Sequence, residues 1–401
     1  MTDELTIPPA VSSADGSSKQ YPVEFKGEGA EFFKIWIVNV LLTIITLSIY
    51  APWAKVRSKR YFYGNTVIDS SSFEYHATGK QIFLGRLIAI VALIAVSLVQ
   101  YIHPFASIAA YAVIFLLIPW VIWRSLKFNA RMSSYRNVRF GFSGTASRVY
   151  FIVFLLPILI LVAGVAVVYG GMQILPDVLS GIVVFAAIIG AYALYPIFHQ
   201  LLAHYSHNFH RYGTAMFAAP LKKRAFCWIY LKAFIPFVLL FAALGGLAYV
   251  VKNNMGIDME SVFEDPESLE AMMDSPLASA AMVAVYAALF LIGSVITAYW
   301  RSMIRNYRYK LTTVGDRVKL HSTVKALPLA WLSISNFLLL IISVGFAYPW
   351  VKVRNARYFA RNTSVSSNGP LDQFAADEQD KVTSIGAELG DAFDLDLDIG
   401  I

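Results

Sequence analysis

Four histidines in one tract are the residues whose spacing most directly suggests chemistry. They are His199, His204, His207 and His210, and the last three are spaced three positions apart, so that neighbours would share one face of a helix and could hold a metal ion. No carboxylate or cysteine lies between residues 195 and 212 to complete a coordination set. We therefore expect no metal centre here, and interpret the tract as a pH-sensitive basic patch on a helix that extends into the cytoplasm.

The carboxylates and the sequence motifs give little support for catalysis. No Asp or Glu lies in the interior of the apolar segments of membrane length, and only Asp177 reaches the end of one, whereas intramembrane acids are the usual proton relays of pumps. The chain has no G-x-S-x-G elbow, no HExxH motif and no P-loop. The sequence therefore predicts neither an enzyme nor a cofactor, and it argues against a carboxylate-coupled pump.

A tract of fifteen residues that occurs twice is the most specific motif in the chain. With an offset of 297 positions, residues 52–66 match residues 349–363 at ten of fifteen positions. Weaker copies lie between the two, so we predict that internal repeats organise the chain. The aromatic and cationic residues of the two copies that could form a binding face are Trp53, Lys55, Arg57, Arg60, Tyr61, Trp350, Lys352, Arg354, Arg357 and Tyr358.

In the first copy, the matched residues follow one stripe of a helix. Trp53, Val56, Arg57, Arg60 and Tyr61 fall at i, i+3, i+4, i+7 and i+8. We predict a short amphipathic interfacial helix whose specified face docks on the protein's own cytoplasmic elements or on lipid phosphates; a plain interfacial anchor is the alternative. Because each cation near an anionic surface contributes about 1 kcal/mol, we expect anionic lipid head groups on the cytoplasmic side as partners.

Two asparagines recur at the same place in the repeat. Asn39 and Asn336 are 297 positions apart and lie in the apolar segments that precede the repeated tracts. Hydrogen bonding between helices would explain them, at about 1 kcal/mol each. The alternative is that they line a polar path through the membrane, and we take them as the candidate residues for such a path.

These residues must be positioned by membrane helices, because the chain is 57% hydrophobic and has a mean hydropathy of +0.58. Eight apolar segments reach membrane length. They lie near residues 32–50, 82–101, 105–123, 149–170, 177–198, 226–250, 277–299 and 327–349. The positive-inside rule places the basic connections in the cytoplasm, which accounts for the net charge of +7 without a nucleic-acid partner.

The first and last apolar segments raise a problem of topology. Two simple spans would put the two repeated tracts on opposite sides of the membrane. We therefore predict about six full spans plus two short, broken or re-entrant terminal segments, which turn near Asn39–Thr46 and Asn336–Ser343; eight full spans is the alternative. Alternation such as Val138, Phe140 and Phe142 predicts small cytoplasmic β elements in an otherwise all-α polytopic membrane protein.

The predicted domain organisation has three parts. Residues 1–20 form a polar, disordered leader without a secretory signal. Residues 21–365 form a transmembrane domain built from repeats. Residues 366–401 form an acidic, disordered tail, whose alternation of acidic and apolar residues could also fold on a protein partner.

The order of these motifs resembles the YjgN family of multi-pass bacterial inner-membrane proteins, which are classed under a domain of unknown function. The stretches that carry the resemblance are "FKGEGAEFFKIWIVNV", "YPWVKVRNARYFARNT" and "GDAFDLDLDIG". The family implies an inner-membrane location and brings no substrate or catalytic residue. We expect a transport or conducting protein for an unknown solute or lipid; the alternative is a non-transporting scaffold or lipid-binding protein that recruits a partner.

Overall fold

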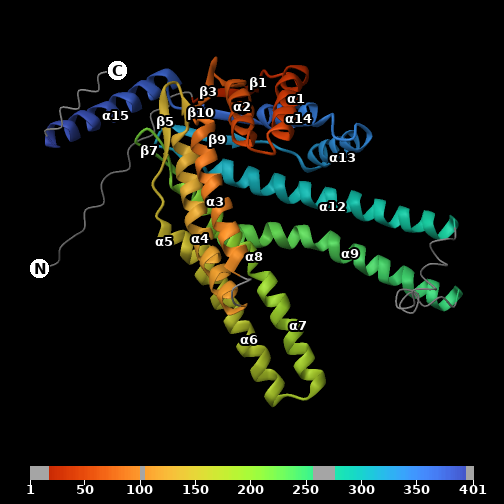
Figure 1. Ribbon diagram of the computed structural model, residues 1–401. Helices are drawn as coiled ribbons and strands as arrows, with labels where there is room; N and C mark the ends of the chain where they lie inside the picture. The colour runs from red at the N-terminus through yellow and green to blue at the C-terminus, as the bar shows by residue number, and fades with distance from the viewer. Residues whose placement is uncertain (1–17, 100–103, 256–275, 394–401) are drawn as a thin grey trace, which may run out of the picture.

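The computed structural model describes residues 18–99, 104–255 and 276–393 (Figure 1). In this part of the chain, the order strand, helical hairpin, strand occurs five times. The strands are β1 (Lys19–Phe25), β2 (Thr66–Ile68), β3 (Ser71–Tyr75), β4 (Ser133–Tyr135), β5 (Val138–Phe142), β6 (His210–Tyr212), β7 (Ala215–Ala218), β8 (Thr313–Val314), β9 (Val318–Ser322) and β10 (Thr363–Ser367).

Two helical arms join the strands of each pair. The arms are α1 (Gly29–Ile45) and α2 (Ala51–Gly64); α3 (Gly79–Val99) and α4 (Pro104–Arg131); α5 (Ala146–Val149), the π-helical stretch η1 (Tyr150–Leu155) and α6 (Leu156–Ile174), followed by α7 (Asp177–Ala193) and α8 (Tyr195–Asn208); α9 (Lys223–Met255) and α12 (Pro276–Leu311); and α13 (Ala326–Ile342) and α14 (Tyr348–Arg361). A final helix, α15 (Leu371–Phe393), follows β10.

The ten strands close into one antiparallel barrel in the order β1-β10-β9-β8-β7-β6-β5-β4-β3-β2. The barrel closes between the two ends of the chain, where Tyr21 of β1 pairs with Val365 of β10. The prediction of an all-α protein with small β elements is therefore wrong. Each strand has only two to seven residues, so no single alternating pattern indicated that strands from all the units would share one sheet.

Tight turns connect the strands at one end of the barrel. Asp69 and Ser70 between β2 and β3, and Arg136 and Asn137 between β4 and β5, have positive φ angles, as two-residue hairpins of type I′ require. Glycines supply the positive φ in the β6–β7 and β8–β9 turns. Because successive strands are antiparallel, all the helical hairpins leave from the opposite end of the barrel.

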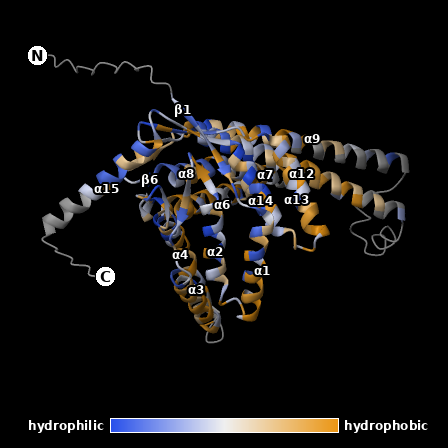
Figure 2. Cartoon of the chain, turned by 90° about the horizontal axis from the view of Figure 1, so that it is seen from above, coloured by the Kyte–Doolittle hydropathy of each residue, from blue (hydrophilic) through white to orange (hydrophobic). Residues whose placement is uncertain are grey.

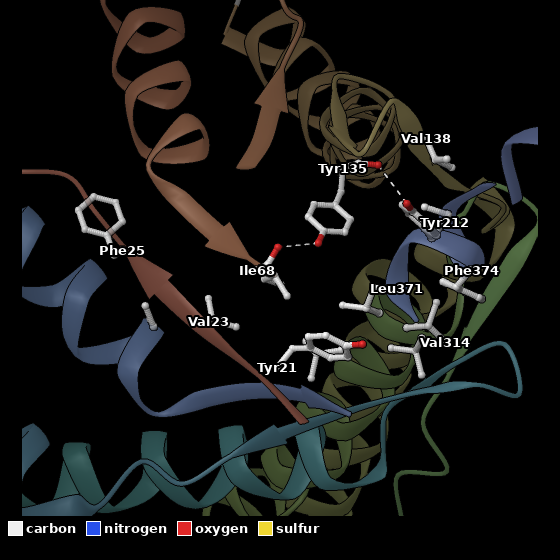
Figure 3. Close-up of a cluster of buried hydrophobic side chains, with 14 of the residues drawn as sticks. Tyr21, Val23, Phe25, Ile68, Tyr135, Val138, Tyr212, Val314, Leu371 and Phe374 are labelled. Atoms are coloured by element: carbon white, nitrogen blue, oxygen red, sulfur yellow. Dashed lines mark hydrogen bonds between the residues drawn. The ribbon is translucent and has the colours of Figure 1, made fainter. Parts of the chain in front are cut away.

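The barrel interior is a packed core (Figure 3). Tyr21, Val23 and Phe25 point inward at every second position of β1, and valines of β5, β8, β9 and β10 meet them. The buried tyrosine hydroxyls donate hydrogen bonds to backbone carbonyls, from Tyr135 to Ile68 at 2.8 Å and from Tyr212 to Tyr135 at 3.0 Å. The core therefore satisfies these two hydroxyl groups internally.

Helix α15 covers the turn end of the barrel. Leu371, Phe374 and Ala375 join the core, and the Phe374 ring stacks on Tyr212 with 5.7 Å between the ring centroids. The Glu378 carboxylate accepts hydrogen bonds from the backbone N–H groups of Thr214 and Ala215, both at 2.8 Å. The segment from residue 366, which we expected to be disordered, thus contains the end of β10 and a docked helix.

Long apolar helices extend away from the barrel (Figures 1 and 2). Among the described residues, five helical segments are long and apolar enough to cross a membrane: Gly79–Val99, Ile108–Arg131, Ala146–Ile174, Val178–Asn208 and Val283–Leu311. Almost none of their apolar surface is buried inside the protein. The described residues thus contain five candidate spans, against the six or eight full spans that the sequence predicted.

The first and last hairpins differ from the others in length. α1 and α13 have 17 residues each, or about 25 Å of helix, and each is followed by a short turn and a second helix. Leu47 and Ser48 in the first turn, and Val344 in the second, have positive φ angles. The chain reverses after Ile45 and Ile342, toward the C-terminal ends of the ranges predicted for the turns.

Candidate functional site

Tyr61 and Tyr358 fasten each terminal hairpin to its own base. The Tyr61 hydroxyl accepts a hydrogen bond from the Glu28 N–H at 2.8 Å and lies 2.9 Å from both the Glu28 carbonyl and the Glu31 carboxylate. Burial and then the Glu31 contact raise the pKa of Tyr61 to about 12. In the last hairpin, the Tyr358 hydroxyl donates to the Lys325 carbonyl at 3.1 Å.

Trp53 and Trp350 pack against the beginning of the next hairpin. A Cβ atom at Gly79, the first residue of α3, would lie 2.3 Å from Cδ1 of Trp53. A Cβ atom at Gly29, the first residue of α1, would lie at the same distance from Cδ1 of Trp350. Because the barrel is closed, the first hairpin lies next to the last one. The same tryptophan–glycine contact therefore joins the first hairpin to the second and the last hairpin to the first.

Arg60 and Arg357 make the corresponding polar contacts. Arg60 donates to the carbonyls of Tyr75 at 3.3 Å and of Ala77 at 3.0 Å, just before α3. Arg357 donates to the carbonyl of Gly27 at 3.1 Å, just before α1. These arginines therefore bind the loop at the base of the neighbouring hairpin.

Asn39 and Asn336 connect the two helices of their own hairpins. The Asn39 amide nitrogen lies 3.4 Å from the Ala54 carbonyl and 3.5 Å from the Ser58 hydroxyl. The Asn336 amide nitrogen donates to the Asn355 side-chain oxygen at 3.2 Å. Both asparagines are buried, and their Oδ1 atoms have no hydrogen-bond partner in the described part of the chain.

A groove of about 840 Å³ lies where the first hairpin meets the last. Its walls come from α1, α2, the end of α13, the turn after it and α14, and they are mainly apolar. Aromatic side chains line it, including Phe32, Trp36 and Tyr348. Of the two asparagines, Asn39 lines this groove and Asn336 does not.

Three lysines give the groove its charge. Lys55 and Lys352, which occupy equivalent positions in the repeat, line it from α2 and α14 together with Lys59. Burial and then the charge of Lys55 lower the pKa of Lys59, whose ammonium group donates to the Asn129 side chain at 2.7 Å. Among the described lining residues there is no carboxylate, so an anion is the complementary ligand.

The predicted binding face thus divides into two sets. The tryptophans, Arg60, Arg357 and the tyrosines contact the protein itself, whereas Lys55 and Lys352 are exposed and line the groove. Arg57 is exposed, with no hydrogen bond or ion pair in the described residues, and Arg354 donates to the Ser335 hydroxyl at 3.0 Å. Each helix therefore contacts the neighbouring hairpin through its tryptophan and arginine, and lines the groove with its lysine.

Sequence reasoning missed Lys59 and the aromatic walls of the groove. Lys59 is not repeated, since Ala356 occupies the equivalent position, and Trp36 corresponds to Ser333. The comparison of repeats therefore discarded both residues. The helical spacing of the lining residues in α1 and α2 could have indicated that they share one face. Only the closure of the barrel, however, brings α14 beside that face.

The histidine tract is divided among several contacts. His199 lies 2.9 Å from the Tyr230 hydroxyl, and His207 lies 2.9 Å from the Arg308 guanidinium group. His204 contacts Asn208 at 2.8 Å. Among the described residues no group of His, Cys, Asp and Glu side chains is arranged to hold a metal ion.

Comparison with known proteins gives the family of the chain. Residues 20–392 match the family described as bacterial protein of unknown function (DUF898). The chain belongs to the DUF898 family. This DUF898 protein is 29% identical over 391 residues to the inner membrane protein YjgN of Salmonella typhimurium (strain LT2), which covers 92% of this chain and 94% of the relative.

A second relative of the DUF898 chain is the inner membrane protein YjgN of Escherichia coli O157:H7, 27% identical over 356 residues, or 84% of this chain and 87% of the relative. No solved structure matches the chain. Together with the five helical segments of membrane length among the described residues, these relatives identify an inner membrane protein of unknown function, as the resemblance implied.

Proposed function

We propose that this DUF898 protein binds an anionic membrane lipid in the groove between its first and last hairpins. The observation that carries the proposal is the combination of mainly apolar walls with Lys55, Lys59 and Lys352 and no described carboxylate. Apolar walls suit an acyl chain, and the lysines suit a phosphate group. The protein is then a lipid-binding membrane protein, with the joined hairpins as its scaffold.

The size and position of the groove support this proposal. Its volume of about 840 Å³ is within the usual range of ligand pockets, about 300 to 1,000 Å³. It lies beside the exposed apolar residues of α1 and of the turn after α13, including Ile44 and Val344. A lipid tail could therefore extend from the groove along apolar surface.

Transport or conduction past Asn39 and Asn336 has weaker support. The two amides lie in different hairpins and each contacts its own partner helix. The barrel interior is filled by side chains and covered by α15. Recruitment of a protein partner by the acidic C-terminal residues stays a prediction, and it is compatible with lipid binding.

Lipid affinity of purified protein in neutral detergent tests the proposal. Native mass spectrometry would compare phosphatidylglycerol with phosphatidylethanolamine for the wild type and for a Lys55→Gln/Lys352→Gln variant. Two lost cations remove about 2 kcal/mol, so the affinity for phosphatidylglycerol should fall about 30-fold, and phosphatidylethanolamine binding should change little.

A matched control is Lys80→Gln/Lys310→Gln, because both lysines are exposed and neither lines the groove. This variant should keep the wild-type preference for the anionic lipid. Equal losses in the two double variants, or a wild type without preference for the anionic head group, would refute lipid binding at this place.

A further inference from the structure

A separate cavity of about 690 Å³ lies between the barrel and α15. Arg139 of β5 and Arg211 of β6 line it from the barrel, and Arg131 lines it from the end of α4. Gln379 and Thr383 of α15 line the other side. The cavity therefore touches both the fixed barrel and the helix that covers its turn end, which lies near β5 in Figure 1.

The strand register brings two of the arginines to the outer face of the barrel. Gly141 of β5 pairs with Arg211 of β6, and a Cβ atom at Gly141 would lie 2.4 Å from Nε of Arg211. The Arg211 side chain thus lies across Gly141, where any other residue would displace it. Arg139, two positions earlier on β5, has its side chain on the same face.

The three cavity arginines carry charge that the described residues do not neutralise. None of them forms an ion pair or hydrogen bond there, and no Asp or Glu is among the described residues that line the cavity. Other arginines at the turn end are paired, with 2.6 Å between Arg136 and Asp372 and 2.6 Å between Arg317 and Asp377. The three cavity arginines are exposed, and because they converge on one cavity without a described lining acid, the cavity suits an external anion.

Glu378, the buried acid of α15, does not offset this charge. Its side chain is 3% exposed. Its carboxylate forms an ion pair with the Lys381 ammonium group at 2.8 Å and accepts a hydrogen bond from the Thr214 hydroxyl at 2.6 Å. One carboxylate oxygen is therefore occupied by the β6–β7 turn and the other by Lys381 of the same helix. The arginines beyond it remain available to a ligand.

We propose that this cavity binds a soluble organic phosphate and that the bound phosphate fastens α15 to the barrel. Guanidinium groups hold phosphate oxygens through paired hydrogen bonds. The cavity is much larger than a phosphate ion alone, and Val138 and Val382 add apolar lining for the rest of the molecule. We propose a soluble phosphate compound rather than a lipid, because α15 lies at the end of the barrel opposite the apolar helical hairpins and so away from the membrane.

Such a site couples ligand binding to the position of α15. A ligand that contacts the arginines of the barrel and the Gln379 amide binds the docked helix better than a displaced one. By linkage, it must stabilise the docked state by the same factor by which docking improves its affinity. The carboxy-terminal helix then reports the concentration of a phosphorylated compound.

Titration calorimetry, which measures the binding of soluble probes to the full chain in nanodiscs of lipids without net charge, tests the site. The probes are inorganic pyrophosphate and adenosine monophosphate, with hydrogen exchange of residues 371–383 as a second readout. We expect binding of at least one probe, slower exchange in α15 on its addition, and a loss of affinity of at least tenfold in Arg139→Gln/Arg211→Gln.

Two further variants keep the test specific. Arg301→Gln removes an exposed arginine that does not line the cavity and should bind the probes as the wild type does. Gly141→Ala keeps every charge but displaces Arg211, and it should weaken binding as well. Wild-type affinity in both the arginine double variant and Gly141→Ala would overturn the proposal.

Two other results would also overturn it. If neither soluble probe binds while phosphatidylglycerol vesicles protect α15, the phosphate source is the membrane. If the probes bind only to a variant that ends at Phe393, the acidic residues 394–401 are the natural occupant of the cavity. Protection of α15 by a soluble probe in the full chain, lost with the arginines, supports the site.

Discussion

Glu378 shows how a single residue can hold a helix in place, although the acidic composition of that helix predicted a disordered tail. Burial raises the pKa of this carboxyl, but the hydrogen bonds from Lys381, Thr214 and Ala215 outweigh burial, so the pKa lies below its usual value of 4.5. An acid with a lowered pKa in the folded state stabilises that state above its usual pKa and loses this effect as the pH falls through the lowered value.

We therefore expect docking of α15 to weaken as the pH falls below about 4.5. Glu378→Gln should reduce this pH dependence, leaving the part due to the Asp372 and Asp377 ion pairs, and should weaken docking at pH 7 by about 2 kcal/mol, since hydrogen bonds to a charged group are lost. Hydrogen exchange of residues 371–383, corrected for intrinsic rates, measures both effects. Asp380→Asn on the exposed face should behave as the wild type; the same loss in that variant would show a nonspecific charge effect.

Only part of this could be predicted from the sequence. The acids of α15 indicated a solvated tail because their partners are turn residues that are distant in the chain, such as Thr214 and Arg317. The repeated residues could be recognised because two copies marked them. Their division into contacts with the neighbouring hairpin and a wall of the groove could not, because it depends on which neighbour each face meets.

At the scale of elements, α2 and α14 act as connectors between hairpins. The sequence predicted one amphipathic helix face in each, and the helix bounds Ala51–Gly64 and Tyr348–Arg361 include the repeated aromatic and cationic residues. The short strands before and after the hairpins gave too little periodicity to indicate a barrel. Pairing between distant units, which no local pattern records, is what closes it.

The connector contacts predict a difference between neighbouring arginines. Arg60→Ala and Arg357→Ala should each lower the free energy of unfolding by about 1 kcal/mol, because each leaves loop carbonyls without a donor. Arg57→Ala, which removes an exposed side chain from the same helix, should cost much less. Thermal unfolding in detergent compares them, and equal effects of Arg57→Ala and Arg60→Ala would argue against the connector role.

At the scale of the whole molecule, the ends of the chain complete a ring of hairpins. β1 pairs with β10, and α1 packs on α14 through Phe33 and Trp350, whose ring centroids are 5.2 Å apart. The groove exists only because this closure brings the first and last hairpins together. Loosening the closure should therefore affect both stability and lipid binding.

Gly29→Ala tests this dependence. The new Cβ atom would lie 2.3 Å from the Trp350 ring, so we expect a loss of stability of about 1 to 3 kcal/mol together with weaker anionic lipid binding. Gly85→Ala is the control, since nothing lies within 4 Å of a Cβ atom there. Wild-type stability and lipid binding in Gly29→Ala would show that the groove does not depend on the contact between the first and last hairpins.

The most direct measurement for the central claim is photocrosslinking with an anionic phospholipid that carries a photoreactive group near its head. The crosslinked peptides would be mapped by mass spectrometry on protein in mixed-lipid nanodiscs. The account predicts crosslinks concentrated in α1 and α14 around Trp36 and Lys352, and lost in Lys55→Gln/Lys352→Gln. Crosslinks spread over α3, α4, α6 and α7 in proportion to their exposed surface, and unchanged in the variant, would contradict it.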